Sequence, residues 1–200
     1  MDTTKTKIKN KNYKNLMPNT NSSTIKVQKR DGRLEDLDIN KIHFVVEEAC
    51  EGLAGVSSSQ IEMNANIQFY DGMTTKDIQN VLVRSANDLI SLEAPNYQYA
   101  AARLLSYDVR KEAHGQYEYI PLLKLILRNI RLGVYDKGIV EKYSKTELKK
   151  LNTWIRRDRD LSFTYAGLRQ VVDKYLVQDR STGQIYETPQ DMYMMIAATL

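Results

Sequence analysis

Val27-Gln-Lys-Arg-Asp-Gly-Arg-Leu-Glu-Asp-Leu-Asp-Ile-Asn-Lys-Ile42 is the stretch that decides the fold. It predicts two short strands joined by a tight turn and followed by the start of a helix. Asp31-Gly32 is a strong hairpin signal, because a type I′ turn requires positive φ at both central residues. Lys29, Arg30 and Lys41 lie at the strand end and the helix start. Cations there suit a polyphosphate, because a helix start already offers unpaired N–H groups and a positive dipole end. On the hairpin alone, a solvated turn is the more ordinary interpretation.

Amphipathic patterns follow this stretch up to Gly115, which is expected to end a helix. They predict four helices, the third running from about Thr75 to Ser91, and a possible third strand at residues 73–74. Ser57 through Gln60 resembles a capping box at the start of the second helix. We therefore expect a mainly α fold in which a four-helix bundle over residues 25–115 is capped by a small β-hairpin or three-stranded sheet.

A second, mostly helical region is expected over residues 116–200. Its signals are an apolar helix over residues 120–130, a capping box at Ser144-Lys-Thr-Glu147, and a hairpin around Asp179-Arg-Ser-Thr-Gly183. Thr188-Pro189 predicts the start of a last helix. Because that helix is apolar to Leu200, we expect the chain to be a truncated part of a larger protein.

The excess positive charge lies at one end of the chain. The net charge is +4, and residues 1–24 contain five lysines against Asp2, so the remainder is neutral. This polar tail is expected to be disordered. A nucleic-acid binder normally has a basic face on its folded part, so we expect no nucleic-acid partner. Cys50 is the single cysteine, and no apolar run has the length of a signal peptide or membrane span. A cytoplasmic protein without a membrane partner is expected.

The fourth predicted helix supplies a second part of a candidate site. Arg103, Tyr107 and Lys111 are four residues apart and share one face. If this face and the start of the third helix meet the hairpin, Lys29, Arg30, Lys41 and Lys111 converge beside Thr75. Such cations repel one another when the pocket is empty, and a triphosphate would offset the repulsion. Alternatively, they are surface charges paired with Glu35, Asp36 and Asp38. His43 and His114 are expected to be ordinary surface or partly buried residues.

Several segments together resemble a known family. They are Val27–Ile42, Ile67-Gln-Phe-Tyr-Asp-Gly-Met-Thr-Thr75, Ala94-Pro-Asn-Tyr-Gln-Tyr-Ala-Ala-Ala-Arg-Leu104, Gly115-Gln-Tyr-Glu118, Arg159-Asp-Leu-Ser-Phe-Thr-Tyr165, Lys174-Tyr-Leu-Val177 and Gly183-Gln-Ile-Tyr-Glu-Thr-Pro-Gln190. The first four resemble the ATP-cone, a nucleotide-sensing domain at the front of many ribonucleotide reductase large subunits. The spacing over residues 25–200 resembles the class I large (alpha) subunit.

The resemblance implies a role for each matching position of the cone. Phosphate-binding positions correspond to Lys29, Arg30, Lys41, Thr75 and Lys111. Positions near the base correspond to Glu35 and Asp38, and apolar walls to Val27, Leu37, Ile42, Ile78 and Tyr107. Gln79 stands where relatives often carry His near the sugar, and Asp38 stands where Asn is common. Both departures lie at the end of the ligand that distinguishes ATP from dATP.

The family implies an allosteric function for this part of the chain. ATP, together with Mg, favours the active enzyme, and dATP favours an inhibited assembly with the small radical-generating subunit. The parent is expected to be a homo-oligomer that reduces ribonucleoside diphosphates for DNA synthesis through a radical cysteine and a redox cysteine pair. Since only Cys50 is present, we expect these residues alone to be inactive.

Two other functions fit parts of the pattern. A transcriptional repressor with a zinc ribbon before the cone would need four cysteines in the tail, which has none. A helical protein-interaction module with a degenerate, non-binding cone stays open, and nucleotide binding discriminates it from the sensor.

Overall fold

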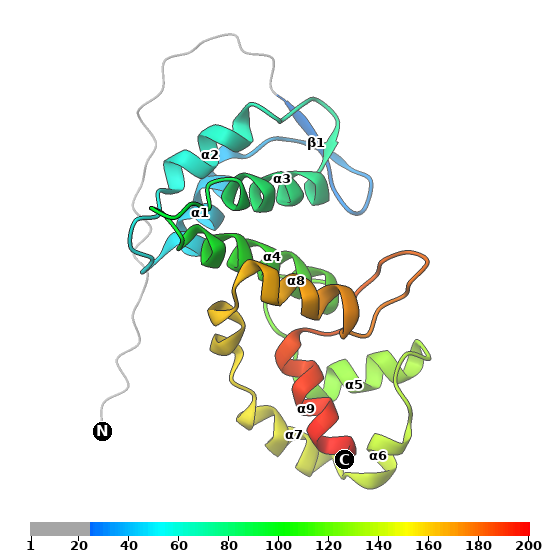
Figure 1. Cartoon of the computed structure of the whole chain (residues 1–200). Helices are drawn as coiled ribbons and strands as arrows, with labels where there is room; N and C mark the ends of the chain where they lie inside the picture. Colours follow the sequence, from blue (N-terminus) through cyan, green and yellow to red (C-terminus); the bar gives the residue numbers. More distant parts are fainter. Residues whose placement is uncertain (1–24) are drawn as a thin grey trace, which may run out of the picture.

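The computed structural model describes residues 25–200, so the predicted disordered tail lies outside the described residues. Figure 1 shows the hairpin and helices α1 to α3 on one side of a long helix, α4, and helices α5 to α9 on its other side. The protein is mainly helical with one small sheet, as the sequence predicted. Among residues 25–200, no helix is long and apolar enough to cross a membrane.

The sheet consists of β1 (Lys26–Gln28), β2 (Leu34–Asp36) and β3 (Met73–Thr74) in the order β2-β1-β3. The β1 strand pairs antiparallel with β2 and parallel with β3, which confirms the expected third strand. The predicted type I′ turn is wrong. Within this turn only Gly32 takes a positive φ, +84°. Asp31 does not, because every residue with a positive φ in the described part of the chain is a glycine. The turn closes through a Gly32 N–H bond to the Lys29 carbonyl, and the left-handed glycine follows as in a longer, bulged hairpin loop.

Four helices complete the first part, and polar side chains start three of them. They are α1 (Ile39–Cys50), α2 (Ser58–Asn66), α3 (Thr75–Asn87) and α4 (Tyr97–His114). Asp38, Ser57 and Thr74 each accept a backbone N–H in the first turn of α1, α2 and α3, which satisfies donors that a helix start leaves unpaired. The capping box expected at Ser57 is only half formed, because the side-chain oxygen of Gln60 accepts from the Tyr97 hydroxyl at 2.6 Å.

The sequence predicted the C-terminal end of α4 correctly and placed that of α3 too late. Gly115 ends α4 with φ +72°, as expected for a left-handed cap. The α3 helix ends before the expected Ser91, because Leu89 and Ile90 close tight turns onto the carbonyls three residues earlier. Leu89 still packs partly against the core, whereas Ile90, which the apolar pattern also placed inward, is exposed.

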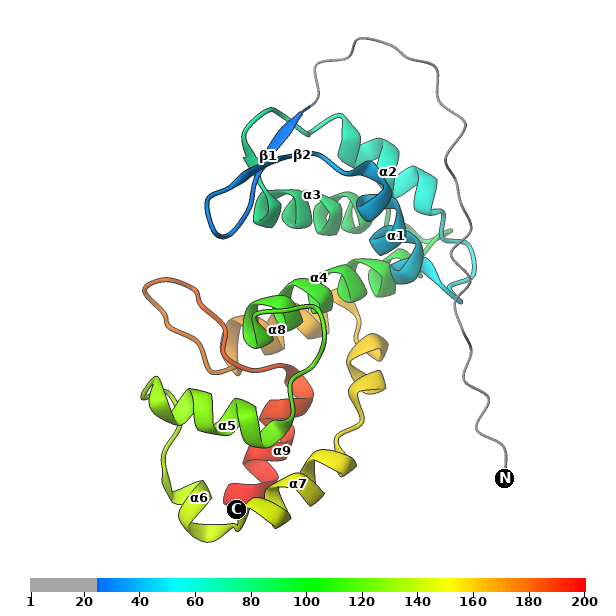
Figure 2. The same ribbon diagram turned by 180° about the vertical axis from the view of Figure 1, so that it is seen from behind.

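Helix α4 is the centre of the larger core. Ala100, Ala101, Ala102 and Leu104 are fully buried in it. On one side α4 packs against α1 and α3, and on the other it packs against α8 (Tyr165–Lys174), as the opposite view also shows (Figure 2). The core therefore continues past Gly115 into residues of the second region. The division of domains at residue 115 stays a prediction.

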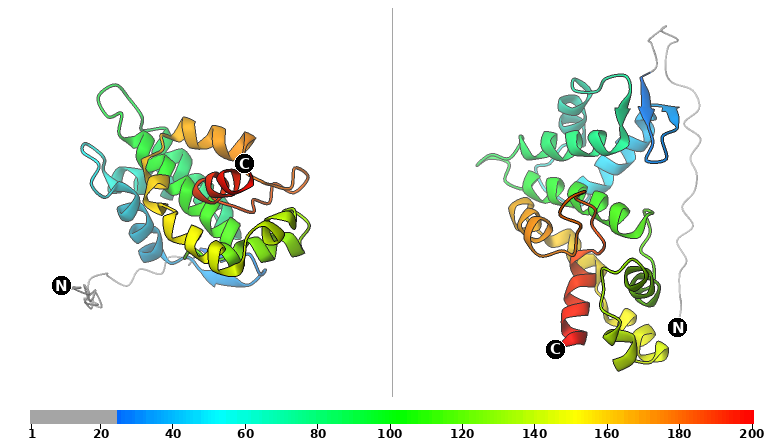
Figure 3. Two further views of the ribbon diagram at one scale, coloured as in Figure 1. Left: turned by 90° about the horizontal axis from the view of Figure 1, so that it is seen from below. Right: turned by 90° about the vertical axis from the view of Figure 1, so that its right-hand side faces the viewer.

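The second region surrounds a smaller core. Its other elements are α5 (Leu122–Arg131), α6 (Gly138–Lys142), α7 (Lys145–Trp154), the 3₁₀ helix η1 (Arg157–Ser162) and α9 (Pro189–Thr199). Leu122, Ile126 and Leu148 meet in this core, and α9 runs down beside α5 and α7 (Figure 3). Ser144 and Glu147 form the predicted capping box. The predicted second hairpin is formed, since the N–H of Asp179 bonds to the Gln184 carbonyl and the N–H of Tyr186 to the Val177 carbonyl. Its two arms are joined by a single antiparallel bridge, Gln178 to Ile185, and are too short to form regular strands. The Val177 N–H bonds instead to the Glu187 carboxylate at 2.9 Å, which interrupts a regular ladder.

A buried polar cluster joins α4 to η1 and α9. The His114 ring nitrogen lies 3.2 Å from one Asp191 carboxylate oxygen, and the Arg157 guanidinium lies 2.6 Å from the other as an ion pair. The side chains of His114 and Asp191 are both fully buried. The expectation of an ordinary surface or partly buried histidine is therefore wrong for His114. It holds for His43, which is exposed and pairs with Glu47 and Glu62. Periodicity placed His114 at a helix end and could not show that α9 covers it.

Asp160 in η1 is the other acid of this cluster. The residue is fully buried, and neither carboxylate oxygen has a hydrogen-bond partner within residues 25–200. Burial raises the pKa of Asp160 to about 7, and Asp191 acts in the same direction, whereas Gln190, Arg157 and Arg110 limit the rise. Between pH 4 and 7 the folded protein therefore holds a proton here that the unfolded chain has released. On account of Asp160, the free energy of unfolding falls as the pH rises through this window.

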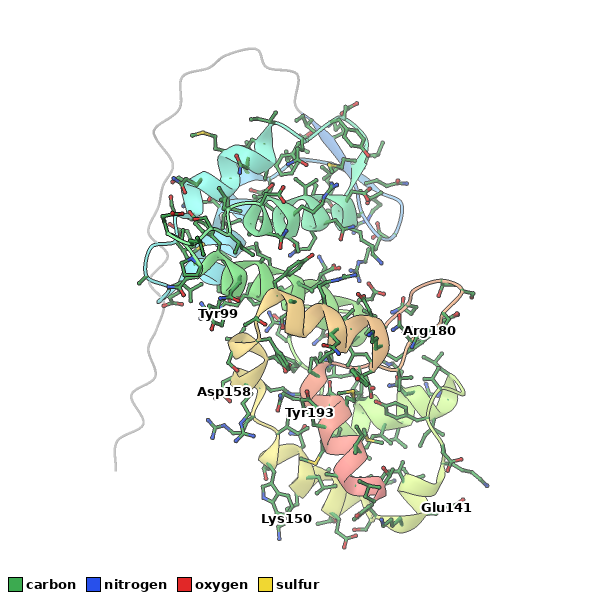
Figure 4. All side chains as sticks on the ribbon, in the orientation of Figure 1. Tyr99, Glu141, Lys150, Asp158, Arg180 and Tyr193 are labelled. Carbon is green, nitrogen blue, oxygen red and sulfur yellow. The ribbon has the colours of Figure 1, made fainter. Side chains whose placement is uncertain are left out.

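We predict that Asp160→Asn stabilises the protein at pH 8 relative to pH 5. The amide cannot ionise, so the variant should gain about 1–3 kcal/mol over the wild type between these two pH values. Urea unfolding at both pH values measures the difference. Asp158→Asn is the matched control, because Asp158 lies two residues away on the outer surface of η1 (Figure 4) and pairs only with exposed Arg156. A stability gain that does not depend on pH would contradict the assignment.

Candidate functional site

The hairpin tip, the start of α3 and the second half of α4 enclose a small cavity. Its volume is about 80 Å³, and its lining residues are Arg30, Val45, Thr75, Gln79, Tyr107, Asp108, Lys111 and Tyr117. Five of these were candidate site residues from the sequence: Arg30, Thr75, Gln79, Tyr107 and Lys111. The cavity thus brings together residues as distant in the chain as Arg30 and Tyr117.

Two cations reach this cavity. Arg30 comes from the hairpin turn, and Lys111 comes from the last turn of α4. Burial lowers the pKa of Lys111, and the positive charges of Arg30, Lys29 and Lys41 lower it further, while Asp108 opposes this. Three of the predicted cations therefore act on Lys111, although only Arg30 lines the cavity with it. Their mutual repulsion favours any anion that enters.

Asp108 was not found from the sequence. Its carboxylate lies 3.3 Å from the Arg30 guanidinium, and its side chain is only 13% exposed. Burial raises the pKa of Asp108, and the charges of Arg30, Lys76 and Lys111 oppose the rise. A usable signal was present, since Asp108 lies three residues before Lys111 and so shares its helix face. Asp108 supplies an internal negative charge at the centre of the cationic site.

The other two cations have partners outside the cavity. Lys29 lies 3.1 Å from Glu35 across the hairpin, and Lys41 lies 3.4 Å from Asp38. The side chain of Lys41 is 71% exposed. The expectation of converging cations without carboxylate partners is therefore wrong. The alternative, pairing with Glu35 and Asp38, describes these two lysines as they stand.

The first turn of α3 contributes polar groups without charge. Thr74 caps this helix by accepting from the Asp77 N–H at 3.0 Å, so Thr75 is the first helical residue and its own N–H stays near the cavity. Gln79, one turn later, donates its side-chain amide to the Leu104 carbonyl at 2.8 Å. This bond ties α3 to α4 and fixes one end of the Gln79 side chain at the cavity wall.

The candidate apolar residues divide into core and wall. Val27, Ile42 and Ile78 are at most 8% exposed and belong to the large core, with Leu37 packed at its edge. Tyr107 is buried and lines the cavity, and burial raises its pKa above the ordinary tyrosine range. Tyr117, another wall residue missed from the sequence, donates its hydroxyl to Glu48 of α1.

Arg103 does not reach the cavity, although it shares a helix face with Tyr107 and Lys111. Its guanidinium donates to the carbonyls of Ala49 at 3.2 Å and Glu51 at 2.6 Å. These carbonyls belong to the C-terminal end of α1, which otherwise lacks partners for them. Of the three residues on this helix face, Tyr107 and Lys111 line the cavity, and Arg103 caps the C-terminal end of α1.

The cavity is chemically suited to phosphate groups but small. Pockets that hold drug-sized ligands measure about 300–1,000 Å³, several times this volume. The Arg30–Asp108 pair closes it at the hairpin side, so a triphosphate would have to separate this pair. Within residues 25–200 no group of three or more His, Cys, Asp or Glu side chains is placed to hold a metal ion.

Comparison with known proteins points to one family. Residues 25–112 match the model of the ATP cone domain, and residues 161–200 match the all-alpha domain of ribonucleotide reductase. The chain is similar to the ribonucleoside-diphosphate reductase 1 subunit alpha of Escherichia coli (strain K12), with 47% identity over 87% of this chain and 23% of the relative. It is 46% identical to the corresponding subunit of Salmonella typhimurium over 90% of this chain and 24% of the relative. For the subunit alpha of Enterobacteria phage T4 the identity is 43%, over 88% of this chain and 23% of the relative. The chain spans about a quarter of the length of these relatives.

We predict that Asp38 stabilises the hairpin-to-α1 junction as a helix cap. Its carboxylate accepts from the N–H groups of Asn40 at 3.1 Å and Lys41 at 3.3 Å. Asp38→Ala should lower the free energy of unfolding by about 1 kcal/mol, whereas Asp38→Asn, an equally good cap, should change it little. Urea unfolding without nucleotide measures both. Equal losses in the two variants would show that the charge, and not the cap, is what counts.

Proposed function

The chain belongs to the ribonucleoside-diphosphate reductase alpha-subunit family and carries an ATP-cone at residues 25–112, and from this premise we propose that the cone binds ATP and dATP as allosteric effectors. The observation that carries the proposal is the cavity in which Arg30 and Lys111 meet the first turn of α3. Cations beside the unpaired N–H groups of a helix start form a site for a polyphosphate.

Each candidate residue has a proposed task in nucleotide binding. Arg30, Lys111 and the Thr75 hydroxyl bind the phosphates, and Lys29 and Lys41 join them when the hairpin adjusts. Tyr107 and the apolar residues Val27, Leu37, Ile42 and Ile78 support the wall. Glu35 and Asp38 lie toward the base, and Gln79 toward the sugar. The ion pairs Lys29–Glu35 and Lys41–Asp38 would rearrange on binding, because a triphosphate is the stronger partner for both lysines.

The effector is proposed to act on a larger enzyme. In that enzyme ATP would favour the active form and dATP an inhibited assembly with the small subunit, and the parent, as a homo-oligomer, would reduce ribonucleoside diphosphates to deoxyribonucleotides. These 200 residues contain only Cys50, and burial raises its pKa to about 11, so the thiol stays protonated near neutral pH. We propose that the radical and redox cysteines lie outside these residues. The cytoplasmic location also remains a proposal.

A helical interaction module without nucleotide is the second candidate. It is favoured by two ion pairs, Arg30 with Asp108 and Lys29 with Glu35, because each pair neutralises positive charge within the protein itself. A cone in which these pairs were too stable to open would be degenerate. Nucleotide binding separates the two candidates directly.

The proposed function is tested by calorimetric titration of the 200-residue chain with ATP and dATP in magnesium buffer. We expect both nucleotides to bind, with affinities that differ by about tenfold at most, because one 2′-hydroxyl hydrogen bond contributes about 0.5–1.5 kcal/mol. Absence of heat with either nucleotide, in a chain that is folded by circular dichroism, would support the interaction module instead.

We predict opposite effects from two substitutions on the same helix face. Lys111→Met should weaken ATP binding about tenfold or more, because charged hydrogen bonds contribute about 1.5–3 kcal/mol each. Asp108→Asn should tighten ATP binding, because it frees Arg30 and removes a negative charge from the site. Lys124→Met on the exposed side of α5 is the control for loss of a distant positive charge. Titration of the three variants is compared with their melting temperatures without ligand. If Asp108→Asn weakened binding, Asp108 would be a ligand-contacting group and not an internal competitor.

A further inference from the structure

Arg110 lies directly behind the aromatic wall of the cavity. Its guanidinium carbon is 4.1 Å from the ring centre of Tyr117 and 5.1 Å from that of Tyr107. Its buried Nε and Nη2 atoms have no hydrogen-bond acceptor within the described residues. Aromatic faces, rather than a carboxylate, therefore hold this cation in place.

The same guanidinium also contacts the second region. It lies 5.0 Å from the ring centre of Tyr119, and Arg157 of η1 lies 4.5 Å from that ring centre. We call Arg110, Tyr119 and Arg157 the arginine–tyrosine stack. Arg157 is in turn bonded to Asp191 at 2.6 Å, and the His114 ring lies 5.2 Å from Tyr119. Side-chain contacts thus run without a gap from the cavity wall to the start of α9.

The stack is electrostatically balanced. Two cations lie over the ring of one tyrosine, and their repulsion is offset in part by Asp191, which lies 2.6 Å from Arg157. A shift of either arginine therefore changes the environment of the other. Packed, charged groups of this kind favour discrete arrangements over gradual deformation.

Occupation of the cavity would disturb the near end of the stack. The cavity of about 80 Å³ is too small for a triphosphate unless its walls move, and Tyr107 and Tyr117 are two of those walls. Both rings contact Arg110. Any outward movement of the rings therefore shifts the cation that they hold.

We propose that the arginine–tyrosine stack couples occupation of the cavity to the packing of η1 and the first turn of α9. This inference rests on the proposed nucleotide function and adds to it the route by which the cone influences the second region. Arg110 and Tyr119 act as positioning residues and do not contact the nucleotide.

The test is hydrogen–deuterium exchange of the 200-residue chain with and without saturating ATP. The readout is the exchange of backbone amides in residues 157–162 and 190–192, and α6 serves as a region that the stack does not contact. We expect ATP to slow exchange in the two segments about fivefold or more, which is the lower range of allosteric coupling. Tyr119→Phe keeps the aromatic face and should behave as the wild type. Tyr119→Leu removes the face and should abolish the slowing while ATP still binds.

The outcomes separate this inference from the proposed function. If ATP binds the wild type but leaves the two segments unchanged, or if Tyr119→Leu responds as the wild type does, the coupling is wrong and the nucleotide function stands. If ATP does not bind the folded wild type, both are wrong. Should Tyr119→Leu not fold, Arg110→Lys replaces it, because lysine keeps the charge but cannot stack as a plane, and it should also lose the slowing.

Discussion

Burial of α4 on two opposite faces is the constraint on which the rest of the structure depends. A helix that is packed on both sides needs small residues where its neighbours approach, and Ala100, Ala101 and Ala102 supply them. The first half of α4 thereby fixes α3 on one side and α8 on the other. Its second half supplies the residues of the site. Tyr107, Asp108 and Lys111 line the cavity, and Arg110 lies over Tyr119 at the boundary with the second region.

The site is assembled so that its charges are nearly balanced before any ligand arrives. Arg30 and Lys111 face one cavity, and the Asp108 carboxylate, 3.3 Å from Arg30, offsets part of the repulsion between the two cations. A balanced site costs little stability when empty. An anion that enters this site must compete with the Asp108 carboxylate for Arg30. Its binding free energy is therefore the difference between the new ion pair and the ion pair that is lost.

Local features of the fold could be predicted from the sequence, and features that join distant segments could not. The hairpin, the caps at Ser57 and Ser144 and the glycine end of α4 depend on neighbouring residues, so pattern was sufficient. The Asp31-Gly32 signal named the hairpin but gave the wrong turn, because Asp-Gly also occurs in longer loops. The family resemblance correctly placed five residues at one cavity, namely Arg30, Thr75, Gln79, Tyr107 and Lys111. Asp108 and Tyr117 were missed, because their place at the cavity follows from how α1 and the hairpin approach α4.

The three-stranded sheet is short, and its brevity has a kinetic consequence. Strands of three and two residues form few ladder bonds, so the hairpin is the part of the cone that can detach at the least cost in free energy. Arg30 would move with it, whereas Lys111 and the helix starts would stay in place. Exchange of an occupant could then proceed by brief local opening, at a rate set by the hairpin and largely independent of how stable the helical core is.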